Sequence, residues 1–333
     1  MTRSIVIAPQ WIGDAVMSEP LLRALAARGE RLAVAALPWV APVYRAMPQV
    51  AEVIELPFAH GRLDWRARRA LGAALRGRFE AAYVLPNSIK AALVPFFARI
   101  PRRVGYHGEG RWLLLTDRLR NVPGRPPMVA FYRALAGEQG GEERPVMQLP
   151  DAVRQAACAV AGVTPGSYRV FAPGAEYGPA KCWPAEHYAA LARSLHAADG
   201  RPVLLLGSGK EAALCEQIAA AAPGACRVMA GRTSLEQAMA LIAASAGVVS
   251  NDSGLMHVAA AFGRAQVAVF GSTSPEHTPP LNPRARVIWL KGESPLTCIP
   301  CFERTCRYGH YGCLTEIRPE RVLQQLRDAE RAA

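Results

Sequence analysis

Lysine and long apolar runs are both scarce in this sequence of 333 residues. Only four of its 39 basic residues are lysines, at Lys90, Lys181, Lys210 and Lys291. An arginine excess of this kind says little about function. A lysine at an unusual position is therefore the more informative sign of a functional site. The longest charge-free stretch, residues 237–251, ends at Asp252 and is shorter than the ~20 residues of a membrane-spanning helix. The sequence therefore predicts no transmembrane helix.

Cysteines are few, and we expect no signal peptide. The apolar run after Arg3 is short and is interrupted by Pro9 and Asp14, unlike a secretory leader. Eight cysteines in a chain of this length do not form a secreted disulfide scaffold. Because 51% of the residues are hydrophobic, the chain can bury a sizeable core, which excludes wholesale disorder. We therefore expect a folded cytoplasmic protein.

Short β-branched runs alternate with alanine- and leucine-rich amphipathic stretches, a pattern typical of α/β folds with parallel sheets. Glycine, glutamate and proline concentrate in residues 137–150, so we predict two domains, residues 1–150 and 151–333. The expected strands are residues 5–8, 32–37, 53–56, 82–85, around Val104, 169–172, 203–206, 248–250, 267–270 and 287–290. The expected helices are residues 15–28, 65–75, 89–98, 185–197, 210–221, 235–244, 254–261 and 319–331.

A predicted strand in the second half runs into Asn251-Asp252-Ser253-Gly254-Leu255-Met256-His257, where an alanine-rich helix begins. Asp252 or Ser253 can cap that helix, and Gly254 lets the backbone approach a ligand. Helix N-termini attract phosphate, because their N–H groups are free and their dipole is positive. The alternative is a capped helix in which His257 satisfies a neighbouring carbonyl.

The loop after the first strand of the second half carries the scarce Lys181. It reads Pro173-Gly174-Ala175-Glu176-Tyr177-Gly178-Pro179-Ala180-Lys181-Cys182-Trp183-Pro184, and Pro184 suits the start of the next helix. A lysine fixed there can neutralise a diphosphate leaving group as a point charge. A solvated surface lysine is the alternative.

Gly207-Ser208-Gly209-Lys210-Glu211-Ala212 follows another predicted strand and matches G-x-G-x-x-A. This pattern is found in dinucleotide-binding loops. It occurs here in the second βα unit of its half, and no strand-end acid follows about 20 residues later. Contact with the ribose or base of a nucleotide is the second interpretation.

Asp14 stands at the first strand-to-helix turn, in Pro9-Gln10-Trp11-Ile12-Gly13-Asp14-Ala15. As an N-cap it would only satisfy backbone donors. As a carboxylate in a cleft it could be the general base that deprotonates an acceptor hydroxyl.

Positive charge is concentrated in residues 61–125, which contain thirteen arginines and one lysine but only four acids. Their net charge is +10, whereas that of the whole chain is +12. Such concentration predicts an anionic partner. Nucleic acid is one option, but no aromatic-basic RNA motif, zinc finger or helix-turn-helix pattern accompanies the region. A phosphorylated glycolipid at a membrane surface is the other option.

Four cysteines fall within sixteen residues, at Cys298, Cys301, Cys306 and Cys313. They could hold a structural zinc ion or an iron–sulfur cluster. The spacing lacks the two separated Cys-x2-Cys pairs of a zinc ribbon. A metal-free structural clip after the last strand is the alternative.

Three long phrases, in order along the chain, resemble the heptosyltransferases of glycosyltransferase family 9. They are Trp11-Ile12-Gly13-Asp14-Ala15-Val16-Met17, residues Pro173 to Lys181, and Asn251 to Ala260; Gly271-Ser272-Thr273-Ser274-Pro275 and Thr278-Pro279-Pro280 add to them. The resemblance covers nearly the whole chain. It implies a GT-B fold, with two Rossmann-like, doubly wound domains facing a cleft. The last helix could pack back on the first domain.

The resemblance also implies an activity, in which heptose moves with inversion from ADP-L-glycero-D-manno-heptose to the first heptose of the lipopolysaccharide inner core. Asp14 would be the base and Lys181 would hold the diphosphate, without a metal ion in the displacement. The enzyme would be peripheral to the cytoplasmic face of the inner membrane and would not bind nucleic acid. Expected donor-binding residues are Gly174, Lys181, Ser208, Glu211, Asp252, Ser253, Gly254, Leu255 and His257. Expected acceptor-binding residues are Gly13, Arg62, Arg66, Arg69, Arg102 and Arg103.

Three other functions remain open at this point. One is another member of the family, with the inner core lacking heptose as acceptor or a different nucleotide sugar as donor. The second is an NAD-dependent oxidoreductase, suggested by Gly207 and Gly209. The third is a non-catalytic nucleic-acid-binding protein, suggested by the basic region alone.

Overall fold

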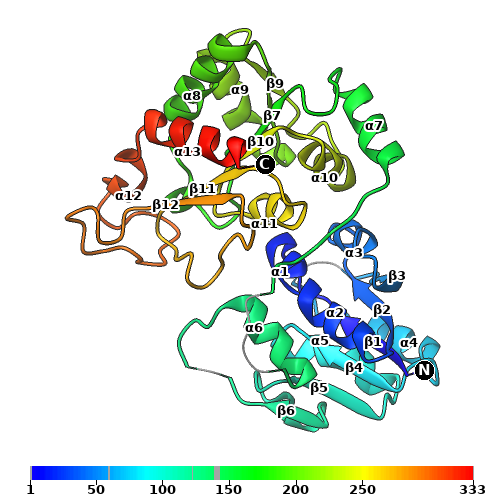
Figure 1. The fold of residues 1–333 in the computed structure, drawn as a ribbon. Helices are drawn as coiled ribbons and strands as arrows, with labels where there is room; N and C mark the ends of the chain where they lie inside the picture. The colour runs from blue at the N-terminus through cyan, green and yellow to red at the C-terminus, as the bar shows by residue number, and fades with distance from the viewer. Residues whose placement is uncertain (1, 59–60, 122, 139–142, 333) are drawn as a thin grey trace. The chain divides into compact units, whose positions relative to one another are not determined.

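The chain forms two compact units, Met1–Gln148 and Leu149–Ala333. The structure, a computed structural model, describes residues 2–58, 61–121, 123–138 and 143–332. Each unit has its own sheet and its own covering helices, labelled in Figure 1.

The first unit is built on a six-stranded parallel sheet in the order β3-β2-β1-β4-β5-β6. Its strands are β1 (Arg3–Ile7), β2 (Arg31–Ala36), β3 (Val50–Glu55), β4 (Ala81–Val84), β5 (Arg102–Tyr106) and β6 (Asp117–Leu119). Its helices are α1 (Ile12–Met17), α2 (Glu19–Ala27), α3 (Ala41–Arg45), α4 (Trp65–Ala74), α5 (Ile89–Phe97) and α6 (Met128–Arg133), with short 3-10 turns η1 (Arg111–Leu113) and η2 (Ala134–Ala136).

The second unit repeats this topology, because its parallel sheet has the order β12-β11-β10-β7-β8-β9. Its strands are β7 (Arg169–Ala172), β8 (Val203–Leu205), β9 (Cys226–Val228), β10 (Gly247–Asn251), β11 (Gln266–Phe270) and β12 (Ala285–Trp289). Its helices are α7 (Asp151–Val160), α8 (Ala185–Asp199), α9 (Ala212–Ala221), α10 (Leu235–Ala243), α11 (Gly254–Ala261), α12 (Gly312–Thr315) and α13 (Pro319–Arg331), with 3-10 turns η3 (Pro179–Lys181) and η4 (Gly209–Glu211).

Both sheets reverse their strand order at one point, between β1 and β4 in the first unit and between β7 and β10 in the second. In doubly wound sheets, ligands bind beside the carboxyl ends of the strands at such a switch point. The prediction of two Rossmann-like units is therefore confirmed, and each unit offers one such edge.

A single predicted helix over residues 15–28 is instead two helices, α1 and α2, which meet at Ser18. Pro20 near the start of α2 explains the break, because proline has no N–H and its ring clashes with the carbonyl four residues before it. The Ser18 hydroxyl donates to the Ala15 carbonyl at 2.7 Å. The break leaves α1 as a short helix directly after β1.

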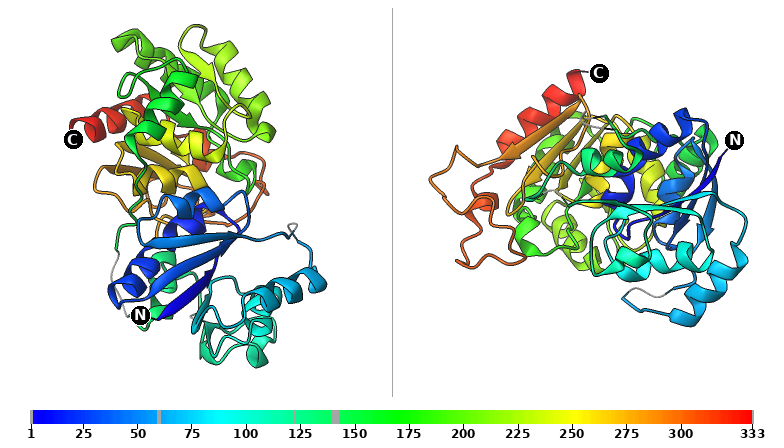
Figure 2. Two further views of the ribbon diagram at one scale, coloured as in Figure 1. Left: turned by 90° about the vertical axis from the view of Figure 1, so that its right-hand side faces the viewer. Right: turned by 90° about the horizontal axis from the view of Figure 1, so that it is seen from below.

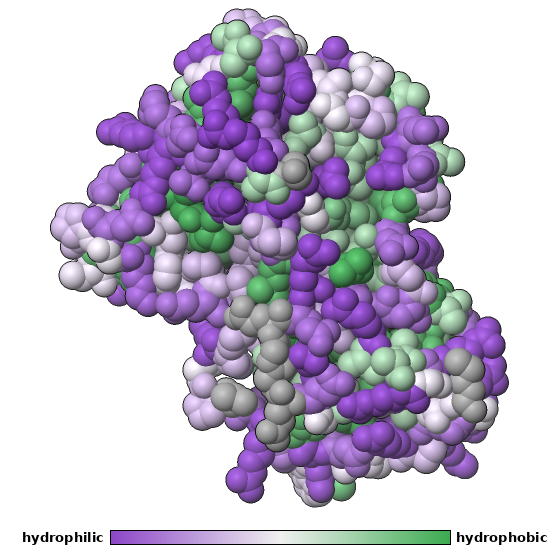
Figure 3. Space-filling view, viewed as in Figure 1, coloured by the Kyte–Doolittle hydropathy of each residue, from purple (hydrophilic) through white to green (hydrophobic). Residues whose placement is uncertain are grey.

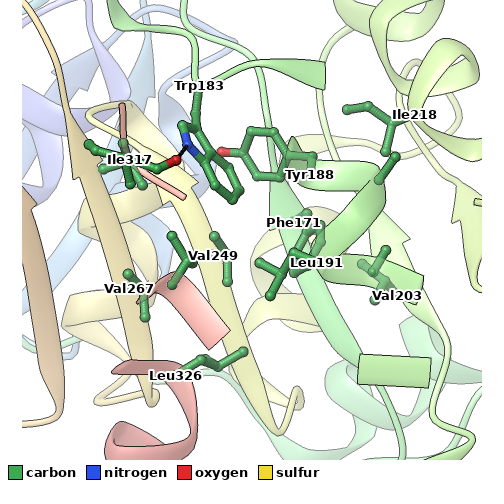
Figure 4. Packing of buried hydrophobic residues seen from close by; sticks show 14 of the residues in the cluster. Phe171, Trp183, Tyr188, Leu191, Val203, Ile218, Val249, Val267, Ile317 and Leu326 are labelled. Carbon is green, nitrogen blue, oxygen red and sulfur yellow. Dashed lines mark hydrogen bonds between the residues drawn. The ribbon is translucent and has the colours of Figure 1, made fainter. Parts of the chain in front are cut away.

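Aromatic packing organises the core of the second unit (Figure 4). The Trp183 and Tyr188 rings meet edge to face with centroids 4.8 Å apart, and Tyr188 also contacts Phe171 on β7. The Trp183 indole N–H donates to the Ile317 carbonyl at 2.9 Å. This bond satisfies a buried donor and ties the loop before α8 to the segment before α13.

The last helix, α13, packs on β10, β11, β12 and α8 of its own unit (Figures 1 and 2). Its Val322, Leu326 and Ala329 are fully buried. Glu330 pairs with Arg169 at the start of β7, with Oε1 2.7 Å from the guanidinium Nε. The helix thus belongs to the second unit's core.

Hydrophilic side chains cover most of the face shown in Figure 3, and apolar ones form small patches. In the part of the chain that the structure describes, no helix is both long enough and apolar enough to cross a membrane. Many of the apolar side chains are instead buried in the cores of the two units.

Candidate functional site

Lys181 and Asp252 meet at the switch point of the second sheet. The Lys181 ammonium donates to Asp252 Oδ2 at 2.6 Å, and the Thr273 hydroxyl donates to the same oxygen at 2.6 Å. Asp252 follows β10 and Thr273 follows β11, so three loops converge on one carboxylate. The Lys181 and Asp252 side chains are only 14% and 5% exposed. Thr273 was not singled out from the sequence, although it lies in the Gly271–Pro275 phrase.

An aromatic ring also holds the Lys181 ammonium. Nζ lies 4.9 Å from the centroid of the Tyr177 ring, and the Arg304 guanidinium lies 5.4 Å from the same centroid. Arg304 Nε donates to the Tyr177 carbonyl at 2.7 Å. Cation–π contacts of this kind favour a charged group over the ring face. The ammonium is therefore oriented from two sides, by a carboxylate and by a ring.

Asn251, the last residue of β10, fastens the Lys181 loop to the sheet. Its side-chain oxygen accepts from the Trp183 backbone N–H at 3.0 Å and from the Tyr188 hydroxyl at 3.1 Å. Its amide nitrogen donates to the Pro173 carbonyl. Because Asn251 is fully buried and all these partners lie around the same loop, the loop has little freedom to move.

Helix α11 begins beside this cluster, with Gly254 and Leu255 in its first turn and Ser253 as its N-cap. The Ser253 hydroxyl is buried and has no hydrogen-bond partner among the described residues. His257 lies one turn further along and is 5% exposed. Burial lowers the pKa of His257 to about 4; Asp252 partly opposes this shift, whereas Lys181 adds to it. The imidazole is therefore neutral at pH 7.

Gly174, Ser208 and Glu211 form a second group on the same sheet edge. The Ser208 N–H donates to Glu211 Oε2 at 2.6 Å. The Glu211 carboxylate lies so close to Gly174 that a Cβ added there would stand 1.7 Å from Oε1. Gly174 thus leaves the space that Glu211 occupies. The structure brings these three predicted residues together.

Asp14 lies in the first turn of α1, and Trp11, not Asp14, is the N-cap. The N-cap interpretation of Asp14 is therefore wrong. Burial, followed by the charge of Asp14 and a hydrogen bond to it, raises the pKa of the Tyr132 hydroxyl well above its ordinary value. Tyr132, from α6, was not foreseen because nothing near it in sequence marks it.

The predicted acceptor residues do not gather in one place. Gly13 is in α1, and Arg66 and Arg69 are exposed on α4, with Arg62 just before it. Arg102 instead begins β5, at the amino end of that strand. Its guanidinium Nε lies 2.7 Å from Asp117 Oδ2. Arg103 donates to the Leu114 carbonyl at 2.7 Å. Arg102 and Arg103 therefore lie away from the carboxyl ends of the strands, where ligands bind in such sheets.

The cysteine loop packs against the Lys181 loop. The Ala180 N–H donates to the Arg304 carbonyl at 3.1 Å, and the Phe302 N–H donates to the Ser272 carbonyl at 2.7 Å. Burial raises the pKa of the Cys306 thiol, but the N–H groups of residues 308–311 donate to the sulfur and bring the pKa below its ordinary value.

Four thiols, Cys298, Cys301, Cys306 and Cys313, line one pocket, and none of them is in a disulfide. Within residues 2–58, 61–121, 123–138 and 143–332, no group of three or more His, Cys, Asp or Glu side chains is arranged to hold a metal ion. The structure therefore gives the zinc or iron–sulfur prediction no support.

Comparison with known proteins decides the family. The profile of glycosyltransferase family 9 (heptosyltransferase) matches residues 68–312. The chain belongs to this family. It is 42% identical to lipopolysaccharide heptosyltransferase 2 of Escherichia coli (strain K12) and 41% identical to that of Salmonella typhimurium (strain LT2), with 97% of each chain covered.

Solved structures agree with the family assignment. The structure of E. coli ADP-heptose lps heptosyltransferase II superposes with a TM-score of 0.86, at 39% identity and over 99% of both chains. A family 9 glycosyl transferase from Veillonella parvula has the same TM-score at 18% identity and supports the fold alone. The resemblance, the GT-B class and the glycosyltransferase prediction are confirmed. The oxidoreductase interpretation finds no support, and Glu211 closes the Gly207-x-Gly209 turn.

Proposed function

We propose that this glycosyltransferase moves L-glycero-D-manno-heptose from ADP-heptose to the first heptose of the lipopolysaccharide inner core, with inversion. The observation that carries the proposal is the Lys181–Asp252 pair beside the N-terminus of α11. The names of the relatives at 38–42% identity support heptose as the transferred sugar and lipopolysaccharide as the acceptor class, and the solved E. coli structure at 39% identity supports ADP-heptose as the donor.

Three features of the second unit support a nucleoside-diphosphate site there. A lysine ammonium has three N–H donors, so Lys181 retains two for phosphate oxygens after bonding Asp252. The buried Ser253 hydroxyl offers another donor, and the first turn of α11 adds backbone N–H groups. Glu211 and Ser208 lie on the same sheet edge, where a ribose would be bound by a carboxylate acceptor.

In the proposed step, the acceptor hydroxyl oxygen attacks the anomeric carbon as the bond from that carbon to the ADP oxygen breaks on the opposite face. The hydroxyl proton passes to the Asp14 carboxylate. Negative charge develops on the diphosphate, next to Lys181 and α11, so both stabilise the transition state more than the ground state. The proposal requires Asp14 and Lys181 to meet at one substrate.

The first unit is proposed to hold the acceptor, at or near the cytoplasmic face of the inner membrane. Its support is the net charge of +10 in residues 61–125, which would attract a glycolipid carrying carboxylates and phosphates. Arg66 and Arg69 of α4 are exposed and would make such contacts. Arg102 is a weaker candidate because Asp117 already neutralises it.

Incubation with ADP-heptose and inner-core acceptors that carry zero or one heptose, followed by mass spectrometry, tests the proposal. We expect a gain of one heptose only on the acceptor that already has one. Transfer to the heptose-free acceptor would instead indicate the first addition. Absence of transfer to both, with intact ADP-heptose recovered, would refute heptose transfer.

A further inference from the structure

The first sheet has a pocket at the same topological position as the Lys181–Asp252 pair in the second sheet. It lies beside the carboxyl ends of β1 to β4 and encloses about 430 Å³ of space that includes open solvent. Its lining includes Ala8 and Gln10 after β1, Phe58 after β3, Ser88 and Lys90 after β4, and Arg68 of α4.

Lys90 differs from the other lysines of the chain in its partners. Lys181, Lys210 and Lys291 each lie within 4.0 Å of a carboxylate, those of Asp252, Glu176 and Glu276. Among the described residues, no carboxylate lies within that distance of the Lys90 ammonium, although this residue is half-buried at the pocket. Lys90 therefore brings to the pocket a positive charge that forms no ion pair with a described carboxylate.

Ser88 adds an unused hydrogen-bonding group to the same pocket. Its hydroxyl is buried and has no partner in the part of the chain that the structure describes. A buried hydroxyl without a partner costs free energy, and a ligand oxygen would remove that cost. Ser88 is also the N-cap of α5, which has nine residues, so the positive end of a helix faces the same side.

The walls of this pocket are held firmly. The Arg68 guanidinium donates to the Lys90 carbonyl at 3.0 Å and lies 4.1 Å from the centroid of the Phe58 ring. The Arg111 guanidinium donates to Asn87 Oδ1 at 3.0 Å and to the Pro86 carbonyl, which fixes the turn between β4 and α5. The nearby carboxylate of Glu109 accepts from the Ile89 N–H at 2.9 Å.

We propose that this pocket binds an anionic group, a carboxylate or a phosphate ester, on the acceptor saccharide. Lys90 and Ser88 would bind the oxyanion. This inference rests on the proposed function, and it replaces Arg102 and Arg103 with Lys90 and Ser88 as acceptor contacts. Two of the four lysines would then serve the two substrates, Lys90 the acceptor and Lys181 the donor.

Steady-state kinetics of Lys90→Ala with three acceptor preparations tests the inference: intact, treated with phosphatase, and with its carboxyl groups reduced. With the intact acceptor we expect the acceptor KM to rise about ten-fold or more, the loss of one charged hydrogen bond, with unchanged kcat and donor KM. Lys90→Arg should recover most of the loss, and Ser88→Ala should lose less. Lys291→Ala is the matched control.

The acceptor preparations identify the anion. Removing the group that Lys90 binds should raise the wild-type KM and abolish the difference between wild type and Lys90→Ala, because the two changes remove one interaction. An unchanged KM for Lys90→Ala, or an equal increase with all three acceptors, would overturn the inference. If wild type transfers nothing, the proposed function fails, and equilibrium dialysis of the intact saccharide with wild type and Lys90→Ala tests the pocket separately.

Discussion

The Lys181 ammonium and the Asp252 carboxylate lie 2.6 Å apart across 71 residues of sequence. They follow β7 and β10, the neighbouring strands at which the second sheet reverses its order. Both side chains are largely buried, so water solvates neither charge well and each charge stabilises the other. Removing only one partner of such a pair leaves an uncompensated buried charge, which costs about 3–5 kcal/mol.

Lys181→Met should therefore lower both activity and stability. We expect kcat to fall about 100- to 1,000-fold, because a positive charge that stabilises the leaving diphosphate is lost. The urea midpoint should fall as well, since Asp252 stays buried without its partner.

The double variant Lys181→Met/Asp252→Asn separates these effects. It removes both charges, so the urea midpoint should return toward wild type while kcat stays low. Initial rates of ADP release and equilibrium unfolding in urea measure the two quantities. Recovery of kcat in the double variant would show that Lys181 only compensates Asp252.

Asp14→Asn should abolish proton removal while preserving the size of the side chain. We expect kcat to fall about 100- to 10,000-fold, the usual contribution of a general base, with little change in melting temperature. Tyr132→Phe, which removes the hydroxyl that interacts with Asp14, should lower kcat less. Asp151→Asn, another acid in the first turn of a helix, is the control, and full activity of Asp14→Asn would exclude the proposed base.

Gly174→Ala should weaken donor binding. The new methyl group would meet the Glu211 carboxylate at 1.7 Å, so Glu211 has to leave its position beside Ser208. We expect the KM for ADP-heptose to rise and the acceptor KM to stay unchanged. Gly209→Ala is a matched control in the neighbouring loop, because nothing lies within 4 Å of its added Cβ. Equal effects of both substitutions on the donor KM would contradict the role of Glu211.

Acid should destabilise the chain partly through His257. Its pKa is lowered by burial from 6.5 to about 4 in the folded state, so between these values the unfolded state binds more protons. Stability should therefore fall as the pH drops from about 6.5 toward 4. The charged groups that act on this imidazole are Asp252 and Lys181.

Urea midpoints of wild type and His257→Gln, measured from pH 7 to pH 4.5, check this prediction. The variant lacks the titrating group, so the wild-type midpoint should fall more steeply with acid than that of the variant. Parallel curves would mean that His257 is not the group responsible.

The sequence predicts most of the fold because strongly periodic segments hardly depend on their surroundings. Strand β7 and helices α11 and α13 have the predicted bounds. The three-residue edge strands β6 and β9 were missed, since so short a segment is defined by its neighbour and not by its own pattern. The break at Ser18 was missed as well, although Pro20 marks it.

The candidate site was partly foreseen, where a side chain follows a strand directly. Lys181, Asp252 and Ser253 were identified because loops after parallel strands meet at one edge. Thr273 and Tyr177 reach the same cluster from other loops, so their roles depend on three-dimensional packing. Arg102 and Arg103 were proposed from charge alone, and charge does not reveal at which end of a strand a residue lies.

The hydrogen bond from Trp183 to Ile317 constrains when the second unit can finish folding during synthesis. It joins an early segment of the second unit to a segment near residue 317. The ion pair of Arg169 on β7 likewise cannot form before Glu330 has been synthesised. The first unit has all six of its strands once residue 119 has been synthesised. During translation, therefore, the first sheet can form before the second unit is complete, and the apolar core of the second unit stays exposed until its last segments have been made.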